Sequence, residues 1–405
     1  MTKKSDAPAI RFKGFSDAWE QRKLSEIADK VTEKNVGLQY VETFTNSAEF
    51  GIISQRDFFD HDIAKLGSLD GYYIVKNEDF VYNPRISTSA PVGPINRNKL
   101  GRTGVMSPLY TVFRPHDIDT TYLEHFFKCG YWHSFMNFNG DSGARSDRFS
   151  IKDNVFFQMP IPIPHIDEQR KIGELLTRLD HLITLHQRKY EKLTNVKKSM
   201  LEKMFPQNGS SFPEIRFKGF TDAWEQRKLG ELISEYKETV DSSCTLPVLT
   251  SSKTEGVILQ EEHFGRKQQH DITGYNVLPR SYCTYRNRSD GVDFTFNVNE
   301  CCDMGIISKF YPIFCGNNND TYFLSLVLNN SDEVVHEIAY TCTGTGQKVL
   351  SFLDLQKMSI RVPRQEEQKK TSAFFKQLDN LITLHQRKLE KLQNIKKSML
   401  EKMFV

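Results

Sequence analysis

The sequence lacks the features of a membrane or secreted protein. No uninterrupted apolar run approaches the roughly 18 residues that a membrane span requires, and the mean hydropathy is −0.51. The first residues include lysines but no apolar stretch follows them, so we expect no secretory signal. The seven cysteines are scattered, and the adjacent pair Cys301 and Cys302 cannot close an ordinary disulfide with itself. We therefore expect reduced thiols in the cytoplasm.

Sequence signatures of catalysis are also missing. The segment from Thr343 to Lys348 imitates a phosphate-binding loop, but its spacing is wrong. Residues 83–86 (Asn-Pro-Arg-Ile) resemble the Asn-Pro-Pro-aromatic signature of adenine methylases without its second proline or its aromatic residue. His336 begins a sequence like a zinc-protease helix, with Tyr340 where the second histidine is needed. We expect no catalytic residue, metal site or bound cofactor in this chain, although a dispersed active site stays open.

The net charge of +3 is too small to indicate a nucleic-acid partner by itself. The charge is distributed unevenly, however. Residues 167–205 carry nine Lys and Arg against six Asp and Glu, and residues 366–405 carry nine against five. The rest of the chain has a slight acidic excess, so the basic excess is concentrated in these two segments.

The chain of 405 residues contains an internal repeat. Residues 10–24 return as residues 215–229 with Thr221 for Ser16 as the one change. Residues 179–205 return as 378–404, and only four of these 27 positions differ. The two long stretches between these blocks are faintly related. A repeat of about 200 residues is too long for a solenoid, so we expect two domains related by a pseudo-twofold axis.

Each repeated helical block has apolar residues at alternating spacings of four and three, which is the pattern of a coiled-coil seam. The seam positions predicted to pack, or to bind partners, are Leu179, Ile183, His186, Leu193, Leu378, Ile382, His385 and Leu392. We interpret the two histidines as polar seam residues that fix the register, in preference to metal ligands. Two copies in one chain can pack on each other, and the pseudo-twofold axis favours an antiparallel pair.

The fold class predicted from these patterns is α+β. It consists of two mixed α/β domains and two long helices packed as an antiparallel coiled coil, in a pseudo-twofold internal repeat. We expect strands at 72–75, 80–82, 257–259 and 294–296, and short helices at 122–127 and 323–328. The predicted domain boundaries are 1–165, 166–207, 208–364 and 365–405.

Basic residues interleaved with Gly, Asn and Tyr occur at corresponding places in the two halves, in residues 80–116 and 265–288. A second loop follows in each half, at 139–148 and 341–348. Such loops can contact phosphates and base edges together. The candidate DNA-binding residues are Tyr82, Arg85, Arg97, Arg102, Arg145, Arg148, Arg266, Lys267, Tyr285, Arg286, Arg288, Gln347 and Lys348.

The chain resembles the specificity (S) subunits of type I restriction–modification enzymes over essentially its whole length. The resemblance depends on the Trp19–Leu24 segment and its copy at 224–229, on the long duplicated helices, and on two further features. One is the spacing Gly104/Ser107/Tyr110, repeated at Gly305/Ser308/Tyr311; the other is the helix entry Pro162–Gln169 with its looser copy Val362–Gln368.

The resemblance implies a non-catalytic subunit that binds double-stranded DNA. Each α/β domain would be a target recognition domain reading half of a split sequence, and the helix pair would be a spacer. Two modification (M) subunits would methylate adenine N6, and two restriction (R) subunits can join them. S-adenosylmethionine, ATP and Mg²⁺ would all bind on those partners. Two alternatives are a DNA-independent adaptor that bridges two identical proteins, and a methylase or nuclease with an unrecognised active site.

Overall fold

The computed structural model describes residues 7–61, 66–141, 147–266, 271–343 and 347–404. The chain divides into two compact units, which are treated separately below. Unit 1 comprises residues 1–187 and 387–405, and unit 2 comprises residues 188–386. Each unit therefore contains one mixed α/β region, the first half of one long helix and the second half of the other.

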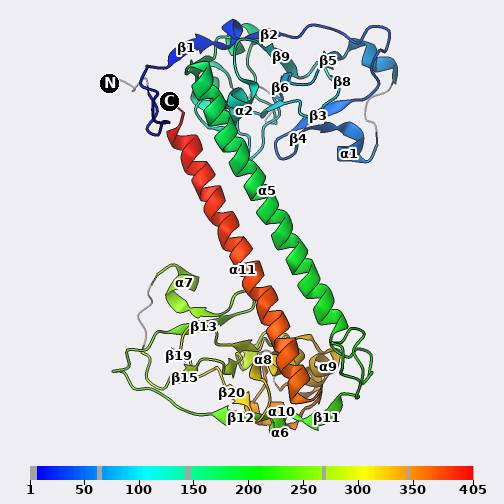
Figure 1. The fold of residues 1–405 in the computed structure, drawn as a ribbon, viewed down its shortest axis with the longest axis vertical. Helices are drawn as coiled ribbons and strands as arrows, with labels where there is room; N and C mark the ends of the chain where they lie inside the picture. The colour runs from blue at the N-terminus through cyan, green and yellow to red at the C-terminus, as the bar shows by residue number, and fades with distance from the viewer. Residues whose placement is uncertain (1–6, 62–65, 142–146, 267–270, 344–346, 405) are drawn as a thin grey trace. The chain divides into compact units, whose positions relative to one another are not determined.

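The strands of unit 1 form a four-stranded antiparallel sheet and three two-stranded pairs (Figure 1). The four-stranded sheet has the order β2 (Ala28–Lys30), β9 (Thr111–Pro115), β6 (Phe80–Tyr82), β7 (Ile95–Arg97). The pairs are β1 (Glu20–Lys23) with β10 (Pro160–Ile163), β3 (Phe44–Ser47) with β4 (Gly51–Ser54), and β5 (Tyr73–Val75) with β8 (Gly104–Met106).

Short helices complete the α/β region of unit 1. They are η1 (Leu24–Glu26), α1 (Gln55–Phe59), η2 (Leu66–Gly71), α2 (Thr120–Lys128), α3 (His133–Asn139) and α4 (Asp153–Phe156). The helix α2 begins where the Asp119 side chain accepts a hydrogen bond from the backbone N–H of Tyr122 at 2.8 Å. This is an ordinary N-cap, which satisfies a donor that the first helical turn leaves unpaired.

Unit 2 repeats this arrangement with strands in the corresponding order. Its four-stranded sheet is β12 (Ile233–Tyr236), β20 (Ile313–Gly316), β16 (Cys283–Thr284), β18 (Asn297–Val298). The pairs are β11 (Glu225–Lys228) with β22 (Ser359–Val362), β13 (Leu249–Ser252) with β14 (Gly256–Leu259), β15 (Asn276–Pro279) with β19 (Met304–Ile307), and β17 (Arg288–Ser289) with β21 (Lys348–Val349). Its short helices are α6 (Leu229–Leu232), α7 (Gln260–Phe264), α8 (Thr321–Asn330), α9 (Asp332–Thr341) and α10 (Phe352–Lys357).

The two long helices have 38 residues each, α5 (Ile166–Lys203) and α11 (Gln365–Lys402). Within unit 1 the first half of α5 packs against the second half of α11, and Lys396 forms an ion pair with Asp180. Within unit 2 the second half of α5 packs against the first half of α11, and the Lys197 ammonium lies 2.6 Å from an oxygen of Asp379. The helices therefore run antiparallel in each unit, as the sequence predicts.

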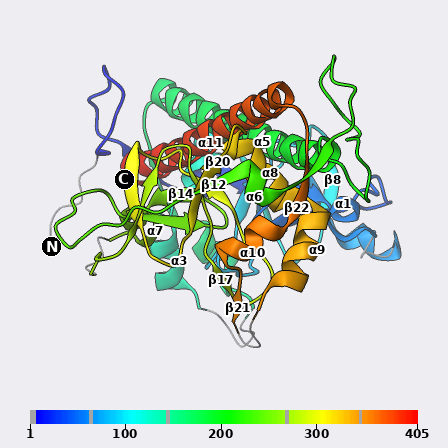
Figure 2. The same cartoon turned by 90° about the horizontal axis from the view of Figure 1, so that it is seen from below.

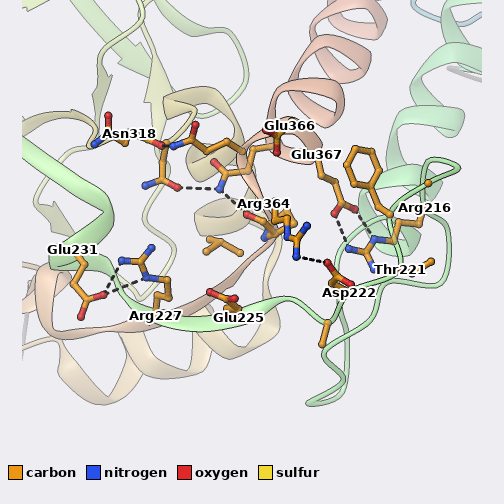
Figure 3. Close-up of a pocket in the computed structure, with 18 of the residues that line it drawn as sticks. Arg216, Thr221, Asp222, Glu225, Arg227, Glu231, Asn318, Arg364, Glu366 and Glu367 are labelled. Carbon is orange, nitrogen blue, oxygen red and sulfur yellow. Dashed lines mark hydrogen bonds and ion pairs between the residues drawn. The ribbon is translucent and has the colours of Figure 1, made fainter.

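The repeated segment at 10–24 and 215–229 joins the ends of the long helices. In unit 1 the backbone N–H of Ile10 bonds to the carbonyl of Lys402 at 2.9 Å, and Arg11 forms a bidentate pair with Glu168 in the first turn of α5. In unit 2 the backbone N–H of Ile215 bonds to the carbonyl of Lys203 at 2.9 Å. Arg216 forms the same bidentate pair with Glu367 (Figure 3). The near-identity of the two segments follows from this shared structural task.

Burial of aromatic and aliphatic side chains against the sheet and helices forms one main core in each unit. The predicted strand at 80–82 and both predicted short helices are confirmed. The predicted strand at 294–296 is wrong, because Phe294 and Phe296 are core residues in a loop that precedes the two-residue strand β18. No helix among the described residues has the length and apolar character to span a membrane.

Candidate nucleic-acid interface

In unit 1 the structure brings together two basic loops that lie about 60 residues apart in the sequence. The backbone of Arg85 forms an isolated antiparallel bridge with that of Arg148. The N–H of Phe149 donates to the carbonyl of Pro84 at 2.7 Å, and the N–H of Ile86 donates to the carbonyl of Asp147 at 3.0 Å. Residues 84–86 and 147–149 are called the first loop pair below.

Unit 2 contains the same arrangement in a slightly longer form (Figure 2). Arg288 pairs with Val349 and Ser289 with Lys348 in the strands β17 and β21, which lie next to each other. The N–H of Leu350 donates to the carbonyl of Asn287 at 3.0 Å. Residues 287–289 and 347–350 are called the second loop pair. Two loops predicted separately from the sequence thus form a single surface in each unit.

The charged side chains of both loop pairs reach the surface. The side chain of Arg85 is 72% exposed and lies 3.8 Å from Asp147, a distance at which an exposed ion pair holds it only weakly. Arg148 and Lys348 are half-buried, while Gln347 is exposed. Arg288 is exposed and its guanidinium lies 4.7 Å from the centre of the Phe310 ring, which restricts its orientation by a cation–π contact. These side chains can donate hydrogen bonds to phosphate or base oxygens.

Both tyrosines predicted to contact DNA are buried. Tyr82 is buried and donates its hydroxyl to the carbonyl of Val92 at 2.9 Å. Tyr285 is buried and donates to the carbonyl of Leu350 at 3.2 Å. Burial raises the pKa of each phenol, so neither ionises. Tyr285 thereby contacts the second loop pair, whereas the partner of Tyr82 lies outside the first. Neither phenol is exposed to a ligand, so the prediction that they contact DNA is corrected.

Arg97 is also a structural residue. Its side chain is 9% exposed and its two terminal nitrogens pair with Glu78 at 3.0 Å and with Glu124 at 2.6 Å. Burial raises the pKa of Glu124, but the opposing effect of Lys128, Arg97 and Lys99 is larger and lowers it to about 2. A guanidinium held in this way joins strand β7 to helix α2 and is not available to a ligand.

The remaining predicted residues are placed as follows. Arg102 is exposed but forms a bidentate pair with Glu42 at 2.7 and 2.8 Å, which neutralises it. Arg266, directly after α7, and Arg286, beside the second loop pair, are both exposed. Arg145 and Lys267 lie outside the described residues.

The predicted seam residues lie in the helix packing described above. Leu179 belongs to the core of unit 1, and Leu392 packs against that core. Leu378 belongs to the core of unit 2, and Leu193 packs against it. Ile183, His186, Ile382 and His385 are half-buried on the same faces. The partner-binding role of these positions stays a prediction.

A polar pocket at the start of α11 is a weaker candidate for DNA binding (Figure 3). Its arginines are paired within the pocket itself: Arg216 with Glu367, Arg364 with Asp222 and Arg227 with Glu231. Because these charges cancel, the pocket presents no excess positive charge to a phosphate. No group of His, Cys, Asp and Glu among the described residues is arranged to hold a metal ion.

An asparagine network beneath the first loop pair was not found from the sequence. The Asn83 carboxamide oxygen accepts the N–H of Arg85 at 3.0 Å, and its amide donates to the carbonyl of Asn46 at 2.7 Å. Asn96 donates to the side-chain oxygen of Asn46 at 2.7 Å. The sequence gives no signal for this network, because Asn46, Asn83 and Asn96 lie in three separate segments that no local pattern joins.

Comparison with known proteins identifies the family. The model described as the type I restriction modification DNA specificity domain matches residues 16–195 and again residues 222–394. This chain therefore belongs to the family of type I restriction–modification DNA specificity domains.

Individual relatives are distant. The specificity subunit of the type I restriction enzyme MjaVIII of Methanocaldococcus jannaschii is 22% identical over 267 residues, covering 62% of each chain. A second protein of that organism is 24% identical over 278 residues, covering 62% of this chain and 60% of that protein. The match spans less than two thirds of either relative. The crystal structure of a type I restriction–modification S subunit from M. genitalium aligns with 98% of this chain and 99% of its own, at a TM-score of 0.55 and 11% identity. That likeness concerns the fold.

Proposed function

We propose that this chain is the DNA sequence-recognition subunit of a type I restriction–modification complex and binds a split target in double-stranded DNA. The observation that carries this proposal is the pair of basic loops joined backbone to backbone at the same place in both units. Membership of the DNA specificity family supports it. Each loop pair offers arginine or lysine, and the second adds the exposed amide of Gln347; these groups suit phosphates and base edges.

In this proposal unit 1 and unit 2 each read one half-site. The scaffolds are alike, and an exposed arginine, Arg85 or Arg288, stands at the same place in each loop pair. The facing segments differ: they carry Asp147 and Arg148 in the first loop pair, and Gln347 and Lys348 in the second. Different surfaces on equal scaffolds are expected where two domains read different sequences. A DNA-independent adaptor would gain nothing from this divergence.

The long helices are the proposed docking sites for two copies of the modification subunit. Leu182 and Leu185 on α5 are exposed, and so are Leu381 and Leu384 at the corresponding positions of α11. Exposed leucines in two identical settings suit two copies of the same partner, because equal surfaces bind equal subunits. The chain itself would be non-catalytic, with adenine-N6 methylation carried out by those partners in the cytoplasm.

The test is a methylation map. The chain is co-expressed with its cognate modification subunit in a host without other N6-methyladenine, and the DNA is sequenced with detection of modified bases. We expect a single split motif, methylated on both strands, that disappears when this chain is omitted. A soluble complex that methylates no motif would contradict the proposal and favour the adaptor. Methylation by the chain alone would favour the enzyme alternative.

A further inference from the structure

Each unit carries a small arm of the same construction, a hairpin followed by a short helix. The first arm is the hairpin β3–β4 with α1, and the second is β13–β14 with α7. Both hairpins turn at a glycine with positive φ, +70° at Gly51 and +73° at Gly256. Both short helices end in a left-handed residue, Asp60 in the first arm and Gly265 in the second. The two arms can therefore be compared position by position at a constant offset of 205 residues.

Both arms are attached at their base by equivalent asparagines. In unit 1 the Asn96 amide donates to Asn46 at 2.7 Å and to the carbonyl of Ser47 at 3.2 Å. In unit 2 the Asn297 amide donates to the Ser251 hydroxyl at 2.8 Å and to the carbonyl of Ser252 at 2.9 Å. These bonds fix the hairpin at the same position on the sheet in each unit.

Both arms are also connected to the loop pairs. In unit 1, Asn83 bonds Asn46 of the hairpin and at the same time the backbone of Arg85. In unit 2 the hairpin residue Lys253 pairs with Asp293, which accepts a hydrogen bond from the Ser289 hydroxyl of β17 at 3.0 Å. These contacts place the arm next to the loop pair in each unit.

The exposed side chains of the arms differ in chemistry. In the first arm Phe50 packs edge-to-face on Phe58 at 6.2 Å between ring centres, and Phe58 on Phe59 at 4.6 Å. These rings are 60%, 40% and 36% exposed, respectively. In the second arm the residues in place of Phe50 and Phe58 are Glu255 and His263, whose Oε2 and Nδ1 lie 2.9 Å apart.

The fold of the arm requires neither the phenylalanine pair nor the glutamate–histidine pair at these two positions. The second arm forms the same hairpin and helix with a carboxylate and an imidazole at the two positions, so Phe50 and Phe58 are not needed to build it. The third ring of the cluster, Phe59, is shared, because Phe264 stands at the same place in the second arm. Exposed aromatic clusters on a soluble protein commonly mark a binding surface. The difference between the arms is therefore explained best by what each arm contacts.

We infer that each arm reads bases next to those at its loop pair and makes the two half-sites chemically different. The first arm would recognise a thymine-containing step through apolar contact of Phe50 and Phe58 with thymine methyl groups. The second would use Glu255, positioned by His263, to accept a hydrogen bond from a cytosine amino group. This inference rests on the proposed function and adds a specificity-determining element to it.

The experiment exchanges the two chemistries. F50E/F58H gives the first arm the residues of the second, and E255F/H263F does the reverse. Each variant is co-expressed with the modification subunit and its methylation map compared with that of the unaltered chain. We expect F50E/F58H to change the bases accepted at one half-site only, and E255F/H263F to change the other half-site only. In each map the unaffected half-site reports that the protein is folded.

Unchanged motifs in both variants would overturn the inference. The failure of the proposed function is recognised separately, because there the unaltered chain directs no methylation. If F50E/F58H abolishes all methylation, F50A is decisive, since Phe50 is the most exposed ring of the cluster. A relaxed base at one half-site in F50A supports the inference, and a wild-type motif overturns it.

Discussion

Units 1 and 2 share the contacts that hold their scaffold together and differ in the side chains that their arms expose. The buried pairs Arg11–Glu168 and Arg216–Glu367 have the same bidentate geometry, and Asn96 and Asn297 fix equivalent hairpins. By contrast, the exposed arms carry a phenylalanine cluster in one unit and a glutamate–histidine pair in the other. The comparison teaches that the chain keeps one scaffold and varies the surface proposed to read DNA.

The largest predicted effect tests the shared scaffold. R216A leaves Glu367, whose side chain is 3% exposed, without its partner, and R11A does the same to Glu168, which is 0% exposed. An uncompensated buried charge is strongly destabilising, so each variant is expected to lose about 3 kcal/mol of unfolding free energy. Urea unfolding monitored by circular dichroism measures this loss.

The matched control for that prediction is R170A, because Arg170 pairs at 3.4 Å with Asp167 and both side chains are 60% exposed. Its expected cost is below about 1 kcal/mol. A loss of unfolding free energy in R11A that differs widely from the loss in R216A would show that the two buried ion pairs are not equivalent.

The second prediction is that the stability of the two units depends differently on pH. His125 in α2 is buried, and burial together with the nearby Lys128 lowers its pKa to about 4. The unfolded chain binds this proton near pH 6.5, whereas the folded chain binds it only near pH 4. Stability therefore falls as the pH falls through this window, by about 2 kcal/mol between pH 7 and pH 5. Unit 2 has Leu326 at the corresponding position, so it has no equivalent loss of stability from a buried histidine there.

Peptide-resolved hydrogen exchange at pH 7 and pH 5, corrected for the intrinsic rate, distinguishes the units. Core peptides of unit 1 are expected to lose more protection than those of unit 2, and H125L is expected to remove most of the difference. Equal loss in the two units, or a difference that persists in H125L, would show that His125 is not its cause.

The smallest predicted effect concerns two equivalent glycines. A Cβ at Gly104 would lie 2.4 Å from the buried ring of Phe44, and one at Gly305 would lie 2.5 Å from a terminal carbon of Leu249. A packed ring yields less than a leucine methyl group, so G104A is expected to cost about 2 kcal/mol and G305A about 1 kcal/mol. Thermal unfolding compares them with G71A, where a Cβ meets nothing within 4 Å. A cost for G104A no greater than that for G71A would contradict this explanation of the repeated glycine.

The long helices and their antiparallel packing could be predicted from the sequence, because a seam with spacings of four and three carries its own signal over many turns. The placement of Arg97 could not, since its partner Glu124 lies on another element and no local pattern joins them. The burial of Tyr82 could not be predicted either, since the carbonyl that accepts its hydroxyl belongs to Val92, ten residues further along the chain. Sequence patterns located the basic loops, but only tertiary structure separates the arginines that support them from those that reach the surface.

The arms could not be predicted from the sequence for a related reason. Their hairpins are short, and at Phe50 and Phe58 the two halves share no residue type with Glu255 and His263. Because these positions differ between the halves, the internal repeat gives no signal at the residues where the two surfaces diverge.

The most direct test of the account is a pair of methylation maps for matched variants of the two loop pairs, R85A/R148A in unit 1 and R288A/K348A in unit 2. Each variant is co-expressed with the modification subunit, and the bases required at each half-site are read from the sequenced DNA. We expect each variant to relax or lose one half-site, a different one in each case, and to keep the other. Maps in which both variants affect the same half-site, or in which neither changes the motif, would contradict this expectation.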